Sequence, residues 1–299
     1  MKAARFYEHG GPEVLRIEDI PRPTAAAGQV VIEVAATSFN PIDAAIRSGV
    51  LTVDLPTTPG LDVAGVVVEV GENVDNLAVG TPVVGYLPRT GAGAAAEYVT
   101  APAGVLTAAP TSIPLADAAA LPLVGLTAWQ AVFEHGELQP DQRVLVNGAG
   151  GAVGCYAVQL AVNAGAEVIA TASASSVDRV RSYGAAKIVD HTDTALSDGV
   201  GDLVDLVINT APTPFAELLG TVRPGGRIVS ATTPVEAGND RGVTAIRMAS
   251  RSDAAQLARL VSAVDNGTLQ VWVGDRRPLE EIAAVHAGRS AGKTILLPK

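Results

Sequence analysis

The sequence predicts an α/β protein with two domains, one built from short strands and one built around a doubly wound parallel sheet. Short β-type runs separated by Gly and Pro fill the first third of the chain, and strands alternate with helices from about residue 121 onward. A glycine-rich turn joins an apolar run to a helical pattern near residue 150. The length of 299 residues suits two domains or one large one, and a hydrophobic content of 48% is enough for a sizeable core.

Short runs of β-branched residues define the first predicted domain. Residues 30–34 and 66–70 are the clearest strands, and Gly and Pro interrupt the chain around them at Pro59-Gly60 and Gly80-Thr81-Pro82. Such spacing favours a compact β-barrel-like domain over residues 1–120. The chain ends on another strand-like run at residues 293–297, so we expect residues 268–299 to return to this domain and complete it.

Alternating strands and helices define the second predicted domain, which we expect to span residues 121–267. The predicted strands lie at residues 143–147, 167–170, 187–190, 203–209 and 227–231. Helices are predicted at residues 152–164 and 176–183, with Gly184 as the C-cap of the second. Residues 253–266 form an amphipathic pattern that Gly267 ends. This order is typical of parallel βαβ units.

The turn after residue 147 has the spacing A-x-G-x-x-G, with Ala149, Gly151 and Gly154 at the three small positions. Between a strand and a helix this motif indicates a Rossmann dinucleotide-binding site. Ala149 permits the tight turn, Gly151 lets a pyrophosphate approach the backbone, and Gly154 lets the helix pack closely. The helix N-terminus offers free N–H groups to phosphates. The predicted binding residues are Ala149, Gly150, Gly151, Ala152 and Val153; a purely structural glycine turn is the alternative.

The segment after the second strand of this domain indicates which dinucleotide binds. An acidic residue there would bind the ribose 2′-OH of NAD, and none is present. Ser173, Ser175 and Ser176 could instead bind the 2′-phosphate of NADPH, with Arg179 as the nearest cation. The alternative is a serine-rich helix N-cap with Arg179 on the exposed face, and both can hold at once. We therefore predict NADPH as the cofactor.

Charge and cysteine content exclude several other functions. The net charge of −10 comes without a basic stripe, so we expect no nucleic-acid partner. A lone Cys155 excludes an intramolecular disulfide and a multi-cysteine zinc site, and its apolar neighbours predict a buried structural thiol. The longest uncharged stretch, residues 118–133, contains Pro122 and is too short for a membrane span. The first residues lack the apolar run of a signal peptide, so we expect a soluble cytoplasmic protein without a membrane partner.

Several short motifs follow one another along nearly the whole chain. They are Gly10-Gly11-Pro12-Glu13-Val14-Leu15, Asn40-Pro41-Ile42-Asp43, Pro59-Gly60-Leu61-Asp62-Val63-Ala64-Gly65-Val66, Leu121-Pro122-Leu123-Val124-Gly125-Leu126-Thr127-Ala128-Trp129 and Arg223-Pro224-Gly225-Gly226-Arg227. In this order the chain resembles the medium-chain dehydrogenase/reductases, and within them the zinc-independent quinone oxidoreductase branch. The resemblance implies a GroES-like β-barrel catalytic domain, a Rossmann domain, a cofactor in the cleft between them, and a homodimer.

The zinc ligands of this superfamily are missing from the chain. Zinc members carry an early Cys, and they have Gly-His-Glu where this chain has Gly60-Leu61-Asp62. The four histidines are scattered at His9, His135, His191 and His286, none at metal-ligand spacing. We therefore predict no metal site. Without a Lewis acid, reduction of an activated small molecule is favoured, either a quinone or an α,β-unsaturated carbonyl compound.

The resemblance also suggests which residues lie near the nicotinamide. Asn40 is expected beside the ring, where its amide could donate to an oxygen that gains negative charge. Asp43 is expected to hold the loop rather than to transfer protons. Thr127 is expected near the ring, although a helix-start hydroxyl is an equal alternative.

Three further segments are expected to line the cofactor. Asn209-Thr210-Ala211 and Ala231-Thr232 follow consecutive strands, at the edge where such sheets bind ligands. His191 lies where relatives often place a residue near the adenine ribose, and a solvated loop histidine is the alternative.

Two other functions stay open from the sequence. One is an enoyl reductase that acts on a CoA- or carrier-linked chain. Related enzymes of that type use a tyrosine where this chain has Gly49-Val50-Leu51, and only scattered Arg22, Arg47 and Arg89 could meet a phosphate in the first domain. The other is a non-catalytic NADPH-binding sensor, which would bind the cofactor but reduce no acceptor.

Overall fold

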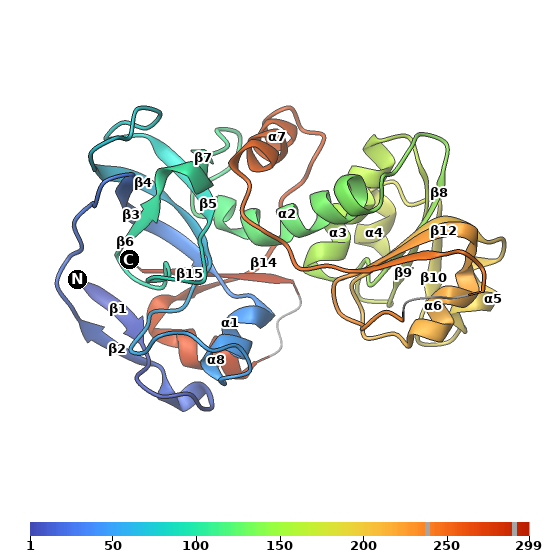
Figure 1. Ribbon diagram of the computed structural model, residues 1–299, viewed down its shortest axis with the longest axis horizontal. Helices are drawn as coiled ribbons and strands as arrows, with labels where there is room; N and C mark the ends of the chain where they lie inside the picture. The colour runs from blue at the N-terminus through green and yellow to red at the C-terminus, as the bar shows by residue number, and fades with distance from the viewer. Residues whose placement is uncertain (237–239, 289–291, 299) are drawn as a thin grey trace. The chain divides into compact units, whose positions relative to one another are not determined.

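The protein, described here by a computed structural model that covers residues 1–236, 240–288 and 292–298, divides into two compact units (Figure 1). Unit 1 combines Met1–Leu123 with Ser252–Lys299, and unit 2 is Val124–Arg251. Each unit has its own sheet, so the predicted α/β class with two domains is confirmed. No helix in the described part of the chain is long and apolar enough to cross a membrane.

Unit 2 is built on a six-stranded sheet in which every neighbouring pair is parallel. Its strands, in the order in which they pair, are β10 (Lys187–Asp190), β9 (Glu167–Ala172), β8 (Arg143–Asn147), β11 (Val204–Asn209), β12 (Val222–Ser230) and β13 (Thr244–Arg247). This is the strand order of a Rossmann sheet, and the order reverses between β8 and β11. The helices are α2 (Pro122–Trp129), α3 (Ala152–Asn163), α4 (Val177–Ser182), α5 (Leu196–Val200) and α6 (Phe215–Thr221).

The strands of unit 2 form where the sequence is richest in β-branched residues. Their inward side chains, with those of α5 and α6, build one buried cluster that includes Leu145, Ile169, Val207 and Ile228. The predicted strands at residues 143–147 and 187–190 are confirmed to the residue. The strand predicted at residues 227–231 begins earlier, because Val222 already pairs with β11 before an irregularity in the register.

Unit 1 is built on a mostly antiparallel seven-stranded sheet centred on one long strand, β3 (Gln29–Ser38). Its other strands are β4 (Asp62–Val70), β5 (Pro82–Tyr86), β6 (Tyr98–Pro102), β7 (Leu106–Ala108), β14 (Val273–Pro278) and β15 (Lys293–Leu297). A separate hairpin pairs β1 (Lys2–Arg5) with β2 (Arg16–Asp19). The helices are α1 (Pro41–Arg47), α7 (Ala254–Asp265) and α8 (Ile282–Ala287).

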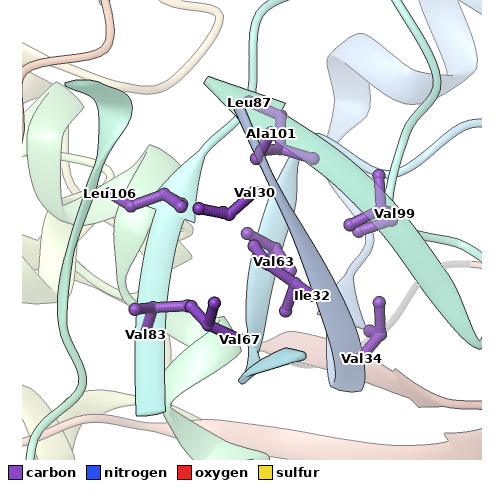
Figure 2. Close-up of a cluster of buried hydrophobic side chains, with 11 residues drawn as sticks. Val30, Ile32, Val34, Val63, Val67, Val83, Leu87, Val99, Ala101 and Leu106 are labelled. Atoms are coloured by element: carbon purple, nitrogen blue, oxygen red, sulfur yellow. The ribbon is translucent and has the colours of Figure 1, made fainter. Parts of the chain in front are cut away.

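Successive side chains of β3 point alternately into the core of unit 1 and to the opposite face of the sheet. Val30, Ile32 and Val34 point into a buried cluster, where they meet side chains of β4, β5 and β6 (Figure 2). At its far end β3 pairs with β15, with Ile295 opposite Ser38. The predicted return of the C-terminal strand to the first domain is therefore confirmed.

The helix predicted at residues 253–266 forms as α7, but it groups with unit 1 rather than with the parallel sheet. The side chain of Asp253 caps it by accepting from the N–H of Gln256 at 2.9 Å. At its other end, Asp265 accepts from the N–H groups of Thr111 and Ser112. The boundary expected at residue 267 was therefore wrong, because these bonds and the contacts of α7 with β7 hold the helix on unit 1.

Candidate functional site

The turn between β8 and α3 has the predicted strand–turn–helix shape, with one difference in how it is built. Gly148, with φ of +88°, makes the sharp change of direction that we assigned to Ala149. Ala149 is fully buried, and its N–H donates to the carbonyl of Thr171 in β9 at 3.1 Å. The Thr171 hydroxyl also accepts from the N–H of Gly148 at 2.8 Å. Neighbouring strand β9 therefore holds the turn in place.

The two fingerprint glycines face different surroundings. A Cβ on Gly154 would lie 2.2 Å from the Gly148 carbonyl oxygen, so close packing of α3 on the turn requires glycine there. A Cβ on Gly151 would meet only that same oxygen, at 3.3 Å. The backbone of Gly151 therefore has little protein above it, and Ala152 and Val153 follow at the helix start, where N–H groups have no intrahelical acceptor. This cradle fits a pyrophosphate.

The serine-rich segment after β9 lies beside the same turn. Arg179 of α4 donates to the carbonyl of Gly150 at 3.2 Å, so its guanidinium lies against the glycine turn. The Ser176 hydroxyl accepts from the N–H of Ser173 at 3.2 Å and is buried. The hydroxyls of Ser173 and Ser175 lie 3.0 Å apart and are exposed. Ser173, Ser175 and Arg179 therefore present polar groups next to the turn, whereas Ser176 serves the local backbone.

A chain of polar side chains crosses the carboxyl ends of four adjacent strands. Thr171 of β9 donates to the side-chain oxygen of Asn147, which ends β8, at 2.9 Å. The Asn147 amide donates to Asn209, which ends β11, at 2.8 Å. Asn209 in turn donates to Ser230 of β12 at 3.1 Å and to Thr232 at 3.2 Å. Asn209 is completely buried, so its side chain orders the edge of the sheet.

The other predicted residues of unit 2 differ in their exposure. Thr210 donates to the carbonyl of Asn147 at 2.9 Å, and the N–H of Ala231 donates to Asn209 at 2.9 Å, so Ala211 and Ala231 lie at the same sheet edge. Thr127 is buried in α2. The His191 side chain is 53% exposed and 4.0 Å from Asp190. His191 therefore has the surroundings of a solvated loop residue.

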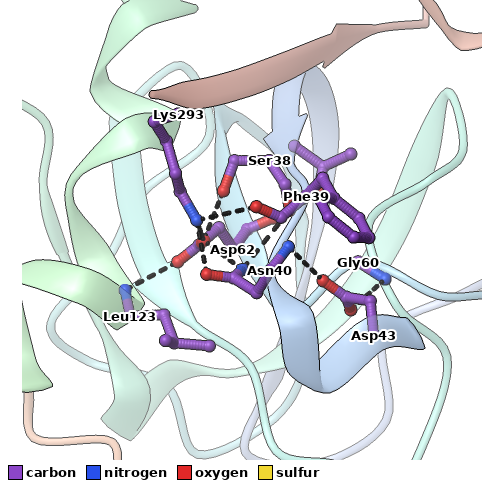
Figure 3. Close-up of polar contacts among 9 residues, drawn as sticks. Ser38, Phe39, Asn40, Asp43, Gly60, Asp62, Leu123 and Lys293 are labelled. Carbon is purple, nitrogen blue, oxygen red and sulfur yellow. Dashed lines mark hydrogen bonds and ion pairs between the residues drawn. The ribbon is translucent and has the colours of Figure 1, made fainter. Parts of the chain in front are cut away.

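Unit 1 contains a buried polar cluster around Asn40, which we call the Asp62 cluster: Ser38, Asn40, Asp62 and Lys293 (Figure 3). The Lys293 ammonium lies 3.2 Å from the Asp62 carboxylate, with the two side chains 3% and 0% exposed. Asp62 also accepts from the hydroxyl of Ser38 and, at 2.7 Å, from the N–H of Leu123. This buried ion pair joins the C-terminal strand β15 to the centre of the sheet.

The Asn40 amide points into the Asp62 cluster. Its NH2 group donates to Asp62 at 2.8 Å and to the Ser38 carbonyl at 3.4 Å, and its oxygen accepts from Lys293. Asn40 is only 1% exposed. The donor role that we expected for this amide does not fit, because both of its hydrogens are engaged inside the protein. The geometry instead makes Asn40 part of the framework that starts α1.

Asp43 holds the first turn of α1, as expected. One carboxylate oxygen accepts from the N–H of Asn40 at 2.8 Å and the other from the N–H of Gly60 at 3.2 Å. Burial raises the pKa of Asp43 to about 6, while the two N–H bonds and the charge of Lys293 act in the opposite direction. Near neutral pH the carboxylate is thus mostly ionised and bound to backbone.

The donor set does not fit the zinc of the zinc-dependent members. Asp62 pairs with Lys293, and Cys155 lies inside α3, where burial raises the pKa of its thiol to about 12. Among the described residues no group of three or more His, Cys, Asp or Glu side chains could hold a metal ion. Cys155 is 1% exposed, which confirms the predicted buried thiol.

Sequence reasoning missed Gly148, Asn147 and the partners of Asn40 in the Asp62 cluster. A signal for Lys293 existed, because it is the one charged residue at the start of an otherwise uncharged final strand. A signal for Asn147 was its position at a strand end that matches Asn209 one parallel strand away. The pairing of Asp62 with Lys293 had no such signal, since they are far apart in sequence.

A Rossmann sheet with a phosphate-binding turn, joined in one chain to a mostly antiparallel unit, defines the class of two-domain α/β oxidoreductases. Family models agree: residues 26–111 match the alcohol dehydrogenase GroES-like domain, and residues 183–296 match the zinc-binding dehydrogenase domain. The chain is 32% identical to the chloroplast envelope quinone oxidoreductase homolog of Arabidopsis thaliana over 100% of its own length and 98% of that protein.

Solved structures of dehydrogenases and quinone oxidoreductases resemble the protein over its whole length. An NAD-dependent alcohol dehydrogenase has a TM-score of 0.92 at 29% identity over 100% of both chains. The quinone oxidoreductase of Escherichia coli in complex with NADPH has a TM-score of 0.89 at 27% identity, also over 100% of both chains. The chain belongs to the quinone oxidoreductase-like branch of the medium-chain dehydrogenase/reductase superfamily.

Proposed function

We propose that the protein is an NADPH-dependent, zinc-independent oxidoreductase that reduces a quinone or an activated α,β-unsaturated carbonyl compound. The observation that carries the proposal is the unobstructed backbone at Gly151 beside the segment that follows β9, which contains serines and no acidic residue before Asp178. Support comes from relatives named quinone oxidoreductases and from the E. coli relative in complex with NADPH.

In this proposal unit 2 holds the dinucleotide. The N–H groups of Ala152 and Val153 bind the pyrophosphate, and Ser173, Ser175 and Arg179 bind the 2′-phosphate. The edge formed by the residues after β11 and β12 lines the nicotinamide half, with Thr127 close to the ring and His191 at the adenine end. When bound, the reduced nicotinamide supplies the hydride, and the protein supplies position and electrostatics.

Neither Asn40 nor Asp43 of unit 1 acts as an acid in this proposal. Asn40 and Asp43 are both bound within the protein, so we propose that they position the start of α1 and do not exchange protons with the acceptor. A quinone suits such a site, since its reduced oxygens can take protons from water. The proposal also includes a homodimer and a cytoplasmic location, which gel filtration and fractionation of cells would test.

The first experiment is a fluorescence titration of the purified protein with NADPH and with NADH. We expect NADPH to bind at least about tenfold more tightly, a difference of about 1.4 kcal/mol. Arg179→Ala should weaken NADPH binding more than NADH binding, because only NADPH carries the 2′-phosphate. Equal affinities in the native protein would overturn the 2′-phosphate assignment, a relevant outcome because one structural relative is NAD-dependent.

The second experiment supplies acceptors to the NADPH-loaded protein. Quinones and simple enones should oxidise NADPH, whereas enoyl-CoA substrates should not. Activity confined to enoyl-CoA would replace the proposed acceptor class, and tight NADPH binding without any turnover would favour a sensor.

A further inference from the structure

Unit 1 contains a pocket of about 930 Å³ that lies entirely within this unit. Its walls come from two loops, one that contributes residues 50–54 and 56–58 and one that contributes residues 89–92, with Arg5, Ile20 and Pro21 completing it. The volume lies within the usual range of small-molecule sites. A much smaller cavity shares Val53, Thr57, Thr58, Arg89 and Gly91 with it and reaches Asp43 of α1 and Gly60.

Backbone contacts hold two of these walls in place. Phe6 and Thr57 exchange a pair of backbone hydrogen bonds, each 3.1 Å long. The N–H of Gly93 donates to the carbonyl of Thr58 at 2.8 Å, and a Cβ on Gly93 would lie 2.3 Å from the Pro59 oxygen. The loop that carries Arg89 is thus tied by a backbone hydrogen bond to the segment that carries Thr58.

The two arginines of the pocket differ in their partners. Arg5 lies 3.4 Å from Glu18, and its guanidinium is 5.4 Å from the ring centre of Tyr7. Arg89 is exposed and has no hydrogen bond or ion pair with any residue that the structure describes. In a chain of net charge −10, a cation of this kind at a pocket rim is available to an incoming anion.

The remaining lining favours a polar, anionic group near Arg89. Thr57, Thr58 and Thr90 line the pocket beside it, and their hydroxyls can donate to anionic oxygens. Asp54 is the one acidic lining residue and is exposed on a different loop. Apolar side chains of Val50, Leu51 and Ile20, with Pro21 and Pro56, complete the wall and suit a flat ring system.

We propose that this pocket selects acceptors that combine an apolar ring with an anionic substituent, a carboxylate, sulfonate or phosphate, which pairs with Arg89. The inference rests on the proposed function, since it takes the occupant to be the acceptor. Arg89 acts as a specificity residue and takes no part in hydride transfer. The guanidinium supplies a bidentate donor for the anion, and the threonines add neutral donors.

The test compares 1,4-naphthoquinone-2-sulfonate with the neutral menadione as acceptors for the NADPH-loaded protein. Arg89→Gln should raise KM for the sulfonate by about fivefold and leave KM for menadione and for NADPH unchanged, as expected for an exposed ion pair. The difference should shrink in high salt. Arg16→Gln removes the same charge from an exposed residue that does not line the pocket, so both KM values should stay constant. Asp54→Asn should lower KM for the sulfonate.

Other results would overturn the proposal. An equal rise of KM for both acceptors in Arg89→Gln would mean that Arg89 only shapes its loop, and equal effects of Arg16→Gln and Arg89→Gln would reduce the effect to net charge. If neither quinone oxidises NADPH, the proposed function fails. Calorimetric titration with the sulfonate then decides the anion site separately: binding that Arg89→Gln weakens supports it, and no binding to the native protein refutes it.

Discussion

The ammonium of Lys293 compensates a carboxylate that has no access to water. Removing one partner of a buried pair leaves the other charge uncompensated, at a cost of about 3–5 kcal/mol. We therefore expect Lys293→Met to lower the free energy of unfolding by about this amount in chemical denaturation. Lys293→Met combined with Asp62→Asn should recover part of the loss, because no isolated charge remains buried. Equal stability of the single and double variants would contradict this account.

His286 is predicted to make the protein sensitive to acid. Burial, aided by the charge of Arg47, lowers the pKa of His286 to about 4, against 6.5 in an unfolded chain. Between these pH values the unfolded chain binds the extra proton, so stability should fall as the pH falls from about 6.5 to 4, by at most about 3 kcal/mol. His286 accepts at Nδ1 from Arg47 at 3.3 Å, and an asparagine oxygen can replace that acceptor without titrating.

His286→Asn should therefore flatten the acid limb of the stability curve, measured by denaturation at pH 4 to 7. Asp43 contributes a slope of opposite sign, because its raised pKa lets the folded protein hold the proton between pH 3.8 and about 6. This contribution is the same in the native protein and the variant, so it cancels in the comparison. An unchanged acid limb in His286→Asn would show that another group controls it.

At the scale of the element, the strand–turn–helix of β8 and α3 offers a matched pair of substitutions. Gly154→Ala places a Cβ 2.2 Å from the Gly148 oxygen and should cost about 1–3 kcal/mol of stability through overpacking. Gly151 has φ of −84°, which alanine can adopt, and a Cβ there would meet no atom closer than 3.3 Å. Gly151→Ala should therefore change the stability of the protein by less than about 1 kcal/mol. Its NADPH affinity should nevertheless fall about tenfold or more, because the methyl group occupies the place proposed for the pyrophosphate.

Thermal unfolding and NADPH titration of both variants separate the two roles. A Gly151→Ala protein with native NADPH affinity would show that the phosphates bind elsewhere. A Gly154→Ala protein with native stability would mean that α3 can move away from the turn without loss.

Elements were predictable from sequence where one local pattern determines them. The strands at residues 143–147 and 187–190 and the caps of α7 follow from short runs of apolar residues and from Asp253 and Gly267. The Asp62 cluster of unit 1 was harder to predict from the sequence. Asn40 could be named, but the direction of its amide depends on Asp62 and Lys293, which reach it only through sheet pairing. Side-chain orientation in such a cluster is a tertiary property and leaves no local pattern.

The whole molecule separates into a continuous and a discontinuous unit, and this predicts how pieces of it behave. The buried cluster described for unit 2 is made of residues between Leu145 and Ala245, so a fragment of residues 122–251, which keeps α2 intact, should fold cooperatively. A fragment of residues 1–121 should not, because it lacks β15 and the cation that pairs with Asp62. Circular dichroism and proton NMR would check both. A folded first fragment would show that β15 is dispensable.

The expected domain boundary at residue 267 was wrong because the packing of one helix could not be read from the sequence. The helix pattern at residues 253–266 looks like one more crossover helix after a parallel strand, because local periodicity does not reveal which sheet a helix covers. The helix is held on unit 1 by hydrogen bonds in which Asp265 accepts from the N–H groups of Thr111 and Ser112, two residues that are distant in sequence. The periodicity therefore predicted the helix correctly, but not the unit on which it packs.

The discontinuity of unit 1 also has a consequence during synthesis on the ribosome. The middle of the chain can complete its sheet once residue 251 has emerged, whereas β3 must wait for β15 at the very end. At about 5–20 residues per second, the roughly 250 residues that separate β3 from β15 give an interval on the order of tens of seconds. During it the first-made segment presents an unpaired strand edge, apolar side chains such as Val30 and Ile32, and a carboxylate without its counter-ion. We therefore expect the segment that contains β3 to be prone to aggregation until β15 has been made.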